Sequence, residues 1–506
     1  MKKTTNRVEK ASIEQTNVEE NPAAKPPRSL TEMDEMAKEA VEMYGEFIEE
    51  GKYPNPMPIA FFLSKAKGEI VYIGPEDRLY RRSSQSGVYA NLPEDLFANE
   101  ILDFLLKYFR RQQGGLAVCH KFNTALVKEI LRLIKGFCRD DHFFDRTPGV
   151  VILHLQNCFL VRHLGDKGFE KFPLDTEWIH SRNQINAAYD PKAKAVRFMD
   201  ELLKPVLDAD EIEVLLQYAA QVVMGENLAE KILVITGLAG AGKSVVVNII
   251  EEIIGKQNVT QLRTECLHGW YETSRYIGRT LLVGKDVPPN FLRNRGASQL
   301  KALTGKDRIN TEAKHSNAVG EIEGKFNVIV TSNSNQPLLL QNDRDAWERR
   351  MLTITFKGKP PKNPIPKFDE LLLREERSGI LNEVLRRLET ILANGGKIEP
   401  SEAQKRAIAD LLDESESERV FLEDRVEAVE VPDGINLRQC KENLTSEELY
   451  LEYLTYCTSR KWTPVPTRKF QQALVDLMPR LFQRFRRNDI ERNGTNRRGY
   501  YAVRFK

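Results

Sequence analysis

Apolar side chains recur at helical spacing in the first part of the chain. From Thr31 they continue in this way up to Gly51, which predicts an amphipathic helix. The same spacing predicts helices over EDLFANEILDFLLKYF and TALVKEILRLI. Shorter patterns predict strands at EIVYI and RLYRR, and these are followed by the apolar run VVILHLQNCFLV. Together these elements predict an α+β leading domain.

A different pattern begins near Lys231, where short, wholly apolar segments alternate with helices and polar loops. The segments that predict strands are KILVIT, TLLVG, NVIVTS and MLTITF. Parallel strands covered on both faces need continuous apolar runs, so these segments indicate a central α/β domain with a parallel sheet. The preceding helix, EIEVLLQYAAQVVMG, ends at Gly225, a residue type that commonly caps helices.

The end of the chain shows a third pattern. An acid-rich stretch, SEAQKRAIADLLDESESE, precedes amphipathic helices over SEELYLEYLTYCTSR and TRKFQQALVDLM. A turn-rich segment from Asn493 to Gly499 then leads into YYAVRF. Helix, helix and terminal hairpin predict a winged-helix-like domain, with the turn as its wing.

These patterns predict a multidomain chain, as its length of 506 residues also requires. The predicted segments are a flexible tail (1–30), the α+β domain (31–209), the α/β domain (210–396), an acidic linker (397–443) and the winged-helix-like domain (444–506).

Charge is distributed unevenly along the chain. The net charge of only +2 favours no particular polyanion as a partner of the whole molecule. However, Arg and Lys dominate from Arg460 onward, whereas residues 401–430 are rich in acids. This asymmetry indicates an end that faces nucleic acid. A solvated basic surface is the alternative.

Neither a membrane segment nor a secretory signal is expected. No apolar run approaches the roughly 20 residues of a spanning helix. The beginning, MKKTTNRVEK, lacks the apolar stretch of a signal peptide, so we expect a cytoplasmic protein. The six cysteines are scattered, with no close pair at zinc-ligand spacing.

A glycine-rich motif carries the clearest chemistry. Residues 237–244 fit the pattern GxxxxGK followed by Ser or Thr, between a predicted strand and a predicted helix. Its backbone N–H groups can surround phosphates, Lys243 can reach the β- and γ-phosphates, and Ser244 can hold Mg²⁺. We therefore expect ATP and Mg²⁺ as ligands. The predicted nucleotide contacts are Gly237, Gly240, Ala241, Gly242, Lys243, Ser244 and Val245.

Polar residues at the ends of later strands complete the candidate site. Asp286 lies just past TLLVG, where a carboxylate can reach the magnesium shell or orient water. Asn333 ends the next buried strand and could position that water. Arg349 and Arg350 precede MLTITF and could stabilise phosphate charge on a neighbouring subunit. The alternatives are a turn aspartate and surface arginines in salt bridges.

In this order the motifs resemble those of the superfamily three helicases, particularly the poxvirus-type and phage or plasmid primase-helicase branch. The resemblance covers most of the chain, including LLQYAAQVVMGENLAEKILVITG before the loop and ELYLEYLTYCTSRKWTPVPTRKF near the end. It implies an AAA+-like ATPase domain. It also implies that Asp286 is the second acidic motif, Asn333 the strand-end asparagine, and the Arg349-Arg350 pair the arginine finger, with Arg350 preferred.

The resemblance also implies contacts with DNA. Lys314 and His315 lie between strand candidates, and they match the tip of the hairpin with which such helicases grip single-stranded DNA. One departure concerns Lys285-Asp286, where the family usually has glutamate, often after another acid. The catalytic carboxylate is therefore shorter and its neighbour is cationic, which could slow hydrolysis.

The C-terminal stretch combines charge with stacking surfaces, as nucleic-acid modules do. Its aromatic residues are Phe485, Tyr500 and Tyr501, although sequence alternation favours a core position for Tyr501, with Val503 and Phe505. The predicted DNA contacts are Arg486, Arg487, Arg497 and Arg498.

We therefore expect a replicative DNA helicase that moves on single-stranded DNA and also binds duplex DNA. A finger acting in trans requires a ring, for which we expect a hexamer. The acids Asp208 and Asp210 begin a helix and are better explained by capping than by a primase site, so priming would need a separate primase or polymerase.

Other functions remain open. The chain could be a replication initiator or loader that does not unwind DNA, or a non-enzymatic DNA-binding scaffold that binds ATP for stability. A small-molecule kinase fits less well, because no acceptor pocket is recognisable in the sequence.

Overall fold

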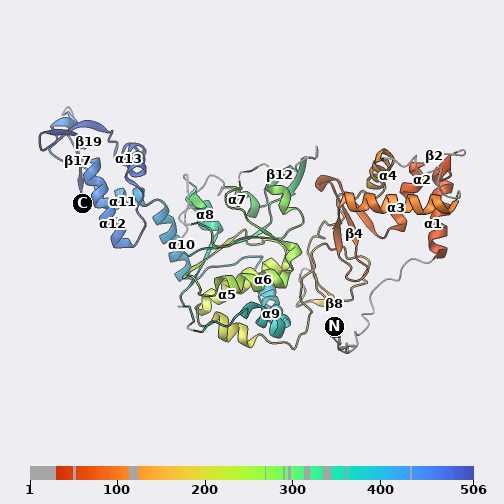
Figure 1. The fold of residues 1–506 in the computed structure, drawn as a ribbon. Helices are drawn as coiled ribbons and strands as arrows, with labels where there is room; N and C mark the ends of the chain where they lie inside the picture. Colours follow the sequence, from red (N-terminus) through yellow and green to blue (C-terminus); the bar gives the residue numbers. More distant parts are fainter. Residues whose placement is uncertain are drawn as a thin grey trace, which may run out of the picture. The chain divides into compact units, whose positions relative to one another are not determined.

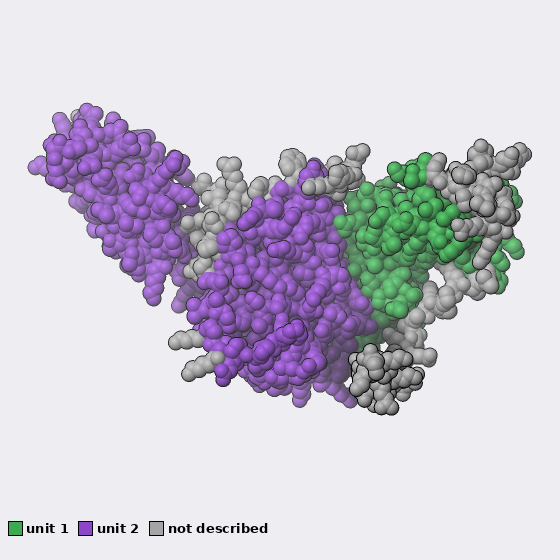
Figure 2. All heavy atoms as spheres, viewed as in Figure 1, with its two compact units in different colours: residues 1–146, 157–159, 171–182 green, residues 147–156, 160–170, 183–506 purple. Residues whose placement is uncertain are grey.

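The computed structural model describes residues 30–49, 53–112, 124–163, 165–267, 269, 271–288, 291–293, 298–312, 319–333, 343–358, 360–361, 363–432 and 436–506. They belong to two compact units, shown in Figure 2. Unit 1 lies within residues 1–146, 157–159 and 171–182, and unit 2 contains the rest.

The first unit combines helices with an antiparallel sheet, as predicted. The order of its strands is β3-β4-β5. Ala40, Leu63, Ile101 and Ile130, one from each helix, are fully buried in a shared core. Its elements are α1 (Leu30–Tyr44), β1 (Ile48–Glu49), β2 (Tyr53–Pro54), α2 (Pro56–Ala66), β3 (Ile70–Ile73), η1 (Gly74–Glu76), β4 (Arg78–Arg82), β5 (Tyr89–Leu92), α3 (Glu94–Gln112) and α4 (Thr124–Phe137).

Two details differ from the sequence prediction. The first helix ends at Tyr44, because Gly45 adopts a φ of 84° and its N–H bonds to the Val41 carbonyl oxygen as a helix cap. In addition, the second unit includes residues 183–209, which we had assigned to the leading domain. This segment hydrogen-bonds to two helices of unit 2: Asn186 N donates to Ile253 O and Arg197 N to Glu376.

The second unit is built on a five-stranded sheet whose neighbouring strands are all parallel. The order across the sheet is β10-β11-β14-β9-β15. The predicted strands all form, and β10 is an addition that the sequence pattern did not reveal. The strands are β9 (Ile232–Gly237), β10 (Val259–Gln261), β11 (Leu281–Gly284), β14 (Asn327–Thr331) and β15 (Met351–Phe356).

Helices cover both faces of this sheet, which explains its wholly apolar strands (Figure 1). Successive residues of a strand point to opposite faces. Ile232 and Val234 therefore belong to the core cluster on one face, whereas Leu233 is buried on the other. The helices on that second face are α5 (Ala209–Met224), α6 (Lys243–Ile254) and α9 (Phe368–Ala393).

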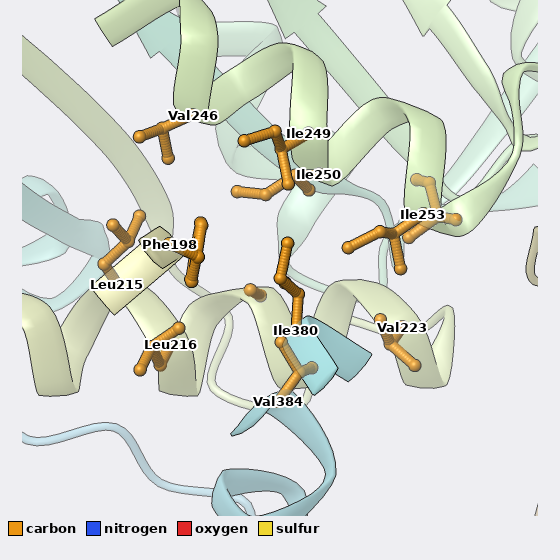
Figure 3. Close-up of a pocket in the computed structure, with 12 residues that line it drawn as sticks. Phe198, Leu215, Leu216, Val223, Val246, Ile249, Ile250, Ile253, Ile380 and Val384 are labelled. Atoms are coloured by element: carbon orange, nitrogen blue, oxygen red, sulfur yellow. The ribbon is translucent and has the colours of Figure 1, made fainter. Parts of the chain in front are cut away.

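The helices of the second face pack on one another through apolar side chains. Leu216 of α5, Ile250 of α6 and Ile380 of α9 point toward a common small pocket (Figure 3). Phe198, from the π-helix η3 (Phe198–Leu203), lines the same pocket. Only apolar residues surround this space, so it is a packing gap of the core.

The first face carries α7 (Gln299–Thr304), α8 (Arg344–Arg350) and α10 (Glu402–Ser415). Between α7 and β14 the chain forms an antiparallel hairpin of β12 (Arg308–Glu312) and β13 (Val319–Glu323). The shorter elements of unit 2 are β6 (Val150–His154), η4 (Lys256–Asn258), η5 (Thr273–Tyr276) and η6 (Phe291–Arg293). Two further strands, β7 (Phe159–His163) and β8 (Glu170–Phe172), have residues in both units.

The predicted acidic linker, residues 397–443, is largely helical and partly buried. Ile408, Leu411 and Leu412 of α10 belong to the same core cluster as the sheet. Among the acids that suggested a linker, Asp413 forms an ion pair with Arg344 of α8 at 2.8 Å. Glu414 is buried and accepts a hydrogen bond from Thr463 N at 3.1 Å. Helical periodicity therefore outweighs acidic composition here.

The C-terminal part has its own apolar core, which includes Phe421, Tyr453, Phe470 and Tyr500. β18 and β19 form a hairpin, and β17 pairs with β19. The elements are α11 (Ser417–Arg425), β16 (Val426–Ala428), η8 (Leu437–Gln439), β17 (Asn443–Thr445), α12 (Ser446–Arg460), α13 (Thr467–Phe482), β18 (Arg487–Arg492), β19 (Thr495–Tyr501) and β20 (Val503–Phe505).

The predicted turn from Asn493 to Gly499 is wrong in extent. Only Asn493 and Gly494 form the turn, with φ angles of 54° and 72°, and the following arginines belong to β19. An Asn-Gly pair with both φ angles positive is the favoured two-residue hairpin turn, because its twist matches the twist of the strands.

Truncation of Leu412 tests whether α10 belongs to the central core. This side chain is fully buried, so we expect Leu412→Ala to lower the free energy of unfolding of unit 2 by about 2–5 kcal/mol. Chemical denaturation would measure the change. Leu451→Ala, at a position that is 65% exposed on α12, is the control and should change stability by less than about 0.5 kcal/mol.

Candidate functional site

The glycine loop (residues 237–242) connects the end of β9 to the start of α6. Gly237, Gly240 and Gly242 adopt φ angles of 140°, 78° and 96°, a region that side chains with a Cβ rarely enter. At Gly237 a Cβ would also lie 2.6 Å from the Phe356 carbonyl oxygen of β15. The loop conformation therefore requires glycine, and it leaves Ser244 exposed in the first turn of a twelve-residue helix.

Lys243 folds its side chain back over this loop. Its Nζ donates to the carbonyl oxygens of Gly237 at 2.8 Å and Leu238 at 2.9 Å, and to Asn333 Oδ1 at 2.8 Å. Ala241 of the loop is buried beside it. The residue is only 4% exposed, and within the described chain no carboxylate lies at ion-pair distance from it. An ammonium group with no ion-pair partner among the described residues is thus held at the start of α6.

The pKa of Lys243 reflects this environment. Burial lowers it below the ordinary lysine value, and the negative charge of Asp286 acts in the opposite direction with a smaller effect. Asp286 is therefore electrostatically coupled to the loop. The parallel sheet explains why: β9, β14 and β11 all end at the same edge, which brings the glycine loop, Asn333 and Asp286 together.

Asp286 is held in a strained backbone conformation. Its φ is 48°, in the left-handed region that costs a residue with a Cβ roughly 1 kcal/mol. Its N–H donates to Thr331 Oγ1 at 2.9 Å, and the next N–H, of Val287, donates to the Thr331 carbonyl oxygen at 2.9 Å. The end of β14 thus fixes the turn that presents this exposed carboxylate.

The side chain of Lys285, the residue before Asp286, extends to α6. Lys285 Nζ lies 2.6 Å from Glu251 Oε2 and 2.8 Å from Asn248 Oδ1, both on α6. The cationic neighbour that we noted beside Asp286 is therefore ion-paired with Glu251.

Arg349 and Arg350 lie at the opposite edge of the sheet. They end α8 directly before Met351, which pairs with Ile232 at the beginning of β9. At about 3.3 Å per residue, the length of β15 separates them from the glycine loop by roughly 17–20 Å. Neither guanidinium can reach a phosphate bound in the loop of its own chain.

The two arginines differ in environment. Arg349 is exposed. Arg350 is partly buried, and its Nη2 lies against Gly305, where a Cβ would be 2.6 Å away. Its Nε is buried and has no hydrogen-bond partner among the described residues. The arginine that we preferred as a finger is therefore the less accessible of the two. The predicted hairpin contacts Lys314 and His315 lie outside the described residues, although the strands that flank them are β12 and β13.

The basic residues of the C-terminal part divide into paired and unpaired groups. Arg497 contacts Glu447 at 3.4 Å, whereas the structure shows no carboxylate partner for Arg486, Arg487 or Arg498 within the described chain. All four are exposed. Of the aromatic residues predicted to stack, Phe485 is 69% exposed, but Tyr500 is fully buried and Tyr501 donates its hydroxyl to the Asp489 carbonyl oxygen.

The alternation expected at the C-terminus is shifted by one residue. Ala502, with a φ of 54°, separates β19 from β20, so that Tyr500 rather than Tyr501 enters the core while Val503 remains buried. A positive φ within an extended segment changes which side successive side chains face.

One surface was missed in the sequence. A shallow hollow between α13 and the beginning of β18 is lined by Arg468, Gln471, Gln472, Val475, Asp476 and Arg486. The signal was available in the segment TRKFQQALVDLM: with Phe470 and Leu474 in the core, helical spacing places its Arg and Gln residues on the outer face.

The residues at the glycine loop fit a nucleoside triphosphate. The glycine loop admits no Cβ at Gly237, and Ser244 is exposed beside it. The ammonium of Lys243 has no carboxylate at ion-pair distance in the part of the chain that the structure describes. Ser244 and Asp286 are the residues that would hold Mg²⁺. The described residues contain no group of three or more His, Cys, Asp or Glu side chains that could hold a metal ion. No described helix has both the length and the apolar character needed to cross a membrane.

Comparison with known proteins gives a limited match. Residues 235–350 match the model of a family of unknown function, DUF5906. This range contains the glycine loop, Asp286, Asn333 and both arginines. Among solved structures, the apo structure of the NrS-1 C terminal region is 13% identical, with 90% of this chain and 100% of that chain covered and a TM-score of 0.44. The A form apo structure of the same region is 12% identical, with coverages of 88% and 99% and a TM-score of 0.43.

Strain at Asp286 yields a prediction. Asp286→Gly relieves the left-handed φ, so we expect this variant to be about 1 kcal/mol more stable than Asp286→Ala, which loses the same carboxylate but keeps the strain. Thermal unfolding of the two variants side by side measures the difference. Equal melting temperatures would mean that the turn relaxes without cost.

Proposed function

We propose that this protein is an ATP- and Mg²⁺-dependent DNA helicase of a replication system. The observation that carries the proposal is the Lys243 ammonium, held at the start of α6 by the glycine loop and Asn333 with no ion-pair partner among the described residues. A triphosphate can replace the loop carbonyls as partner of this cation, while the N-terminus of α6 favours its negative charge. In this role the loop is a P-loop.

Two strand-end residues would assist hydrolysis. Asn333 already contacts Lys243, so its amide lies where it can orient a water molecule near the terminal phosphate. Asp286, exposed and turned outward by Thr331, would bind Mg²⁺ together with Ser244. The position of the loop strand β9 between β14 and β15 suits an AAA+-like ATPase domain.

The distant arginines support a ring. Because Arg349 and Arg350 cannot reach the loop of their own chain, any action on phosphate must occur on a neighbouring subunit. A head-to-tail arrangement in which each subunit supplies its neighbour closes into a cyclic oligomer, for which we propose a hexamer.

DNA contacts are proposed at two places. The β12–β13 hairpin would carry Lys314 and His315 to a single strand passing through the ring. The C-terminal part, with α13 beside the β18–β19 hairpin, would act as a winged-helix-like module on duplex DNA. From residue 436 onward, this part has fifteen Arg and Lys against seven Asp and Glu. Following the family resemblance, we propose a phage, plasmid or other mobile element as its context, with a separate primase or polymerase as partner.

One observation favours a second candidate, a replication initiator or loader that switches shape without processive unwinding. Asp286 has no second acid beside it, since the preceding residue is Lys285, and slow hydrolysis suits a switch better than a motor. A strand-displacement assay separates the two functions: unwinding of a forked duplex with ATP requires the helicase.

Substitution of Lys243 tests the proposed site. We expect Lys243→Ala to lose DNA-stimulated ATP turnover by about 100-fold or more, because the phosphates lose their principal cationic partner. Steady-state phosphate release, with and without single-stranded DNA, is the measurement. The control is Lys256→Ala, at an exposed lysine of η4, which follows α6. This variant should keep wild-type turnover. Retained turnover in Lys243→Ala would refute the site.

Mixing experiments test action between subunits. Arg349→Ala or Arg350→Ala should bind ATP but hydrolyse it slowly. Addition of Lys243→Ala protein, which has intact arginines, should restore part of the activity if the arginine acts across an interface. Strictly additive activities of the mixture would argue against a shared site.

Charge substitutions test the duplex-binding surface. The double variant Arg468→Ala and Arg486→Ala should weaken duplex binding and reduce the slope of log K against log salt by about 1.8. Fluorescence anisotropy at several salt concentrations gives this slope. The control replaces Arg438 and Arg504, which are ion-paired with Asp489 and Glu427. An equal loss of duplex affinity in both double variants would indicate that binding depends on total positive charge rather than on this surface.

A further inference from the structure

A polar network joins the end of β11 to two helices. Lys285 directly precedes Asp286, and its ammonium is bound by Glu251 at 2.6 Å and Asn248 at 2.8 Å. Asn248 in turn donates its Nδ2 to Asp369 Oδ2 of α9 at 2.7 Å. The amide is thereby oriented with its oxygen toward Lys285. The ammonium has two partners on α6, and one of them is fixed by a second helix.

This arrangement differs from an ordinary surface ion pair. Glu251 and Asn248 are three positions apart and therefore share one face of α6. The Lys285 side chain is 38% exposed and that of Glu251 only 19%. By contrast, Glu252 on the same helix pairs at 2.6 Å with Lys256, whose side chain is 80% exposed. Exposed ion pairs of that kind contribute little to the stability of the fold.

The position of Lys285 matters because of its neighbour. Lys285 extends to α6, where its Nζ meets Glu251 and Asn248. Asp286 follows in a left-handed backbone conformation, and its charge acts on Lys243. A lysine side chain is long and flexible. Without partners on α6, the same ammonium could turn back toward Asp286, occupy its oxygens and repel a divalent cation.

We propose that Glu251 and Asn248 are positioning residues that hold the Lys285 ammonium on α6 and so keep the Asp286 carboxylate available for Mg²⁺ with ATP. The inference rests on the proposed ATP-binding function. It explains how this chain tolerates a cation beside its metal-binding carboxylate, since the charge of Lys285 is balanced by Glu251.

The test is the Mg²⁺ dependence of binding of a fluorescent, non-hydrolysable ATP analogue to the full chain. Glu251→Gln removes the balancing charge, and we expect it to raise the Mg²⁺ concentration for half-maximal binding about fivefold. Adding Lys285→Ala to this variant removes the competing ammonium, so the double variant should return to the wild-type Mg²⁺ dependence. Glu252→Gln, the matched control on the exposed pair, should resemble wild type.

The outcomes distinguish a positioning role of Glu251 from a purely structural role. Rescue in the double variant supports the positioning role, because a purely structural defect in Glu251→Gln would persist after the second substitution. An unchanged Mg²⁺ dependence in Glu251→Gln, or a defect that Lys285→Ala does not correct, overturns the inference while leaving ATP binding intact. Failure of the wild-type protein to bind the analogue with Mg²⁺ overturns the proposed function and the inference with it.

Discussion

The parallel pairing of β9, β14 and β11 is the constraint on which the rest of the site depends. Because all three strands run in the same direction, their ends meet at one edge. There Lys243 reaches Asn333, although the two residues are 90 positions apart in the chain. The same pairing sends the residues before β15 to the far edge. The topology of the sheet thus places the glycine loop at one edge and the two arginines at the opposite edge.

The central sheet is stable because both of its faces are buried. The helices that bury them come from distant parts of the chain. One face needs α10, whose Leu411 and Leu412 come after the long helix α9. The other needs α5, α6 and α9, with their apolar contacts shown in Figure 3. Since α6 both begins at the glycine loop and fills this core, the position of Lys243 is tied to the packing of the whole layer.

Charge compensation then decides which groups remain available for function. Lys285 is bound by Glu251, and Arg497 contacts Glu447, whereas Lys243 and Arg486 have no described acidic partner. A cation without a carboxylate keeps its capacity for an anionic ligand. These two cations lie at the glycine loop and on the C-terminal part, the regions for which we propose nucleotide and DNA as ligands.

The sequence by itself determined the local elements: the apolar strands, the glycine loop and the helix caps at Gly225 and Asp208, because these depend on neighbouring residues. It also indicated that Asn333 and Asp286 follow strands. Only the tertiary structure decided that Lys285 turns to Glu251, that α10 joins the core, that Arg350 is partly buried and that Phe485 rather than Tyr500 is exposed. These outcomes depend on contacts between distant residues and on a single positive φ at Ala502, which no local periodicity encodes.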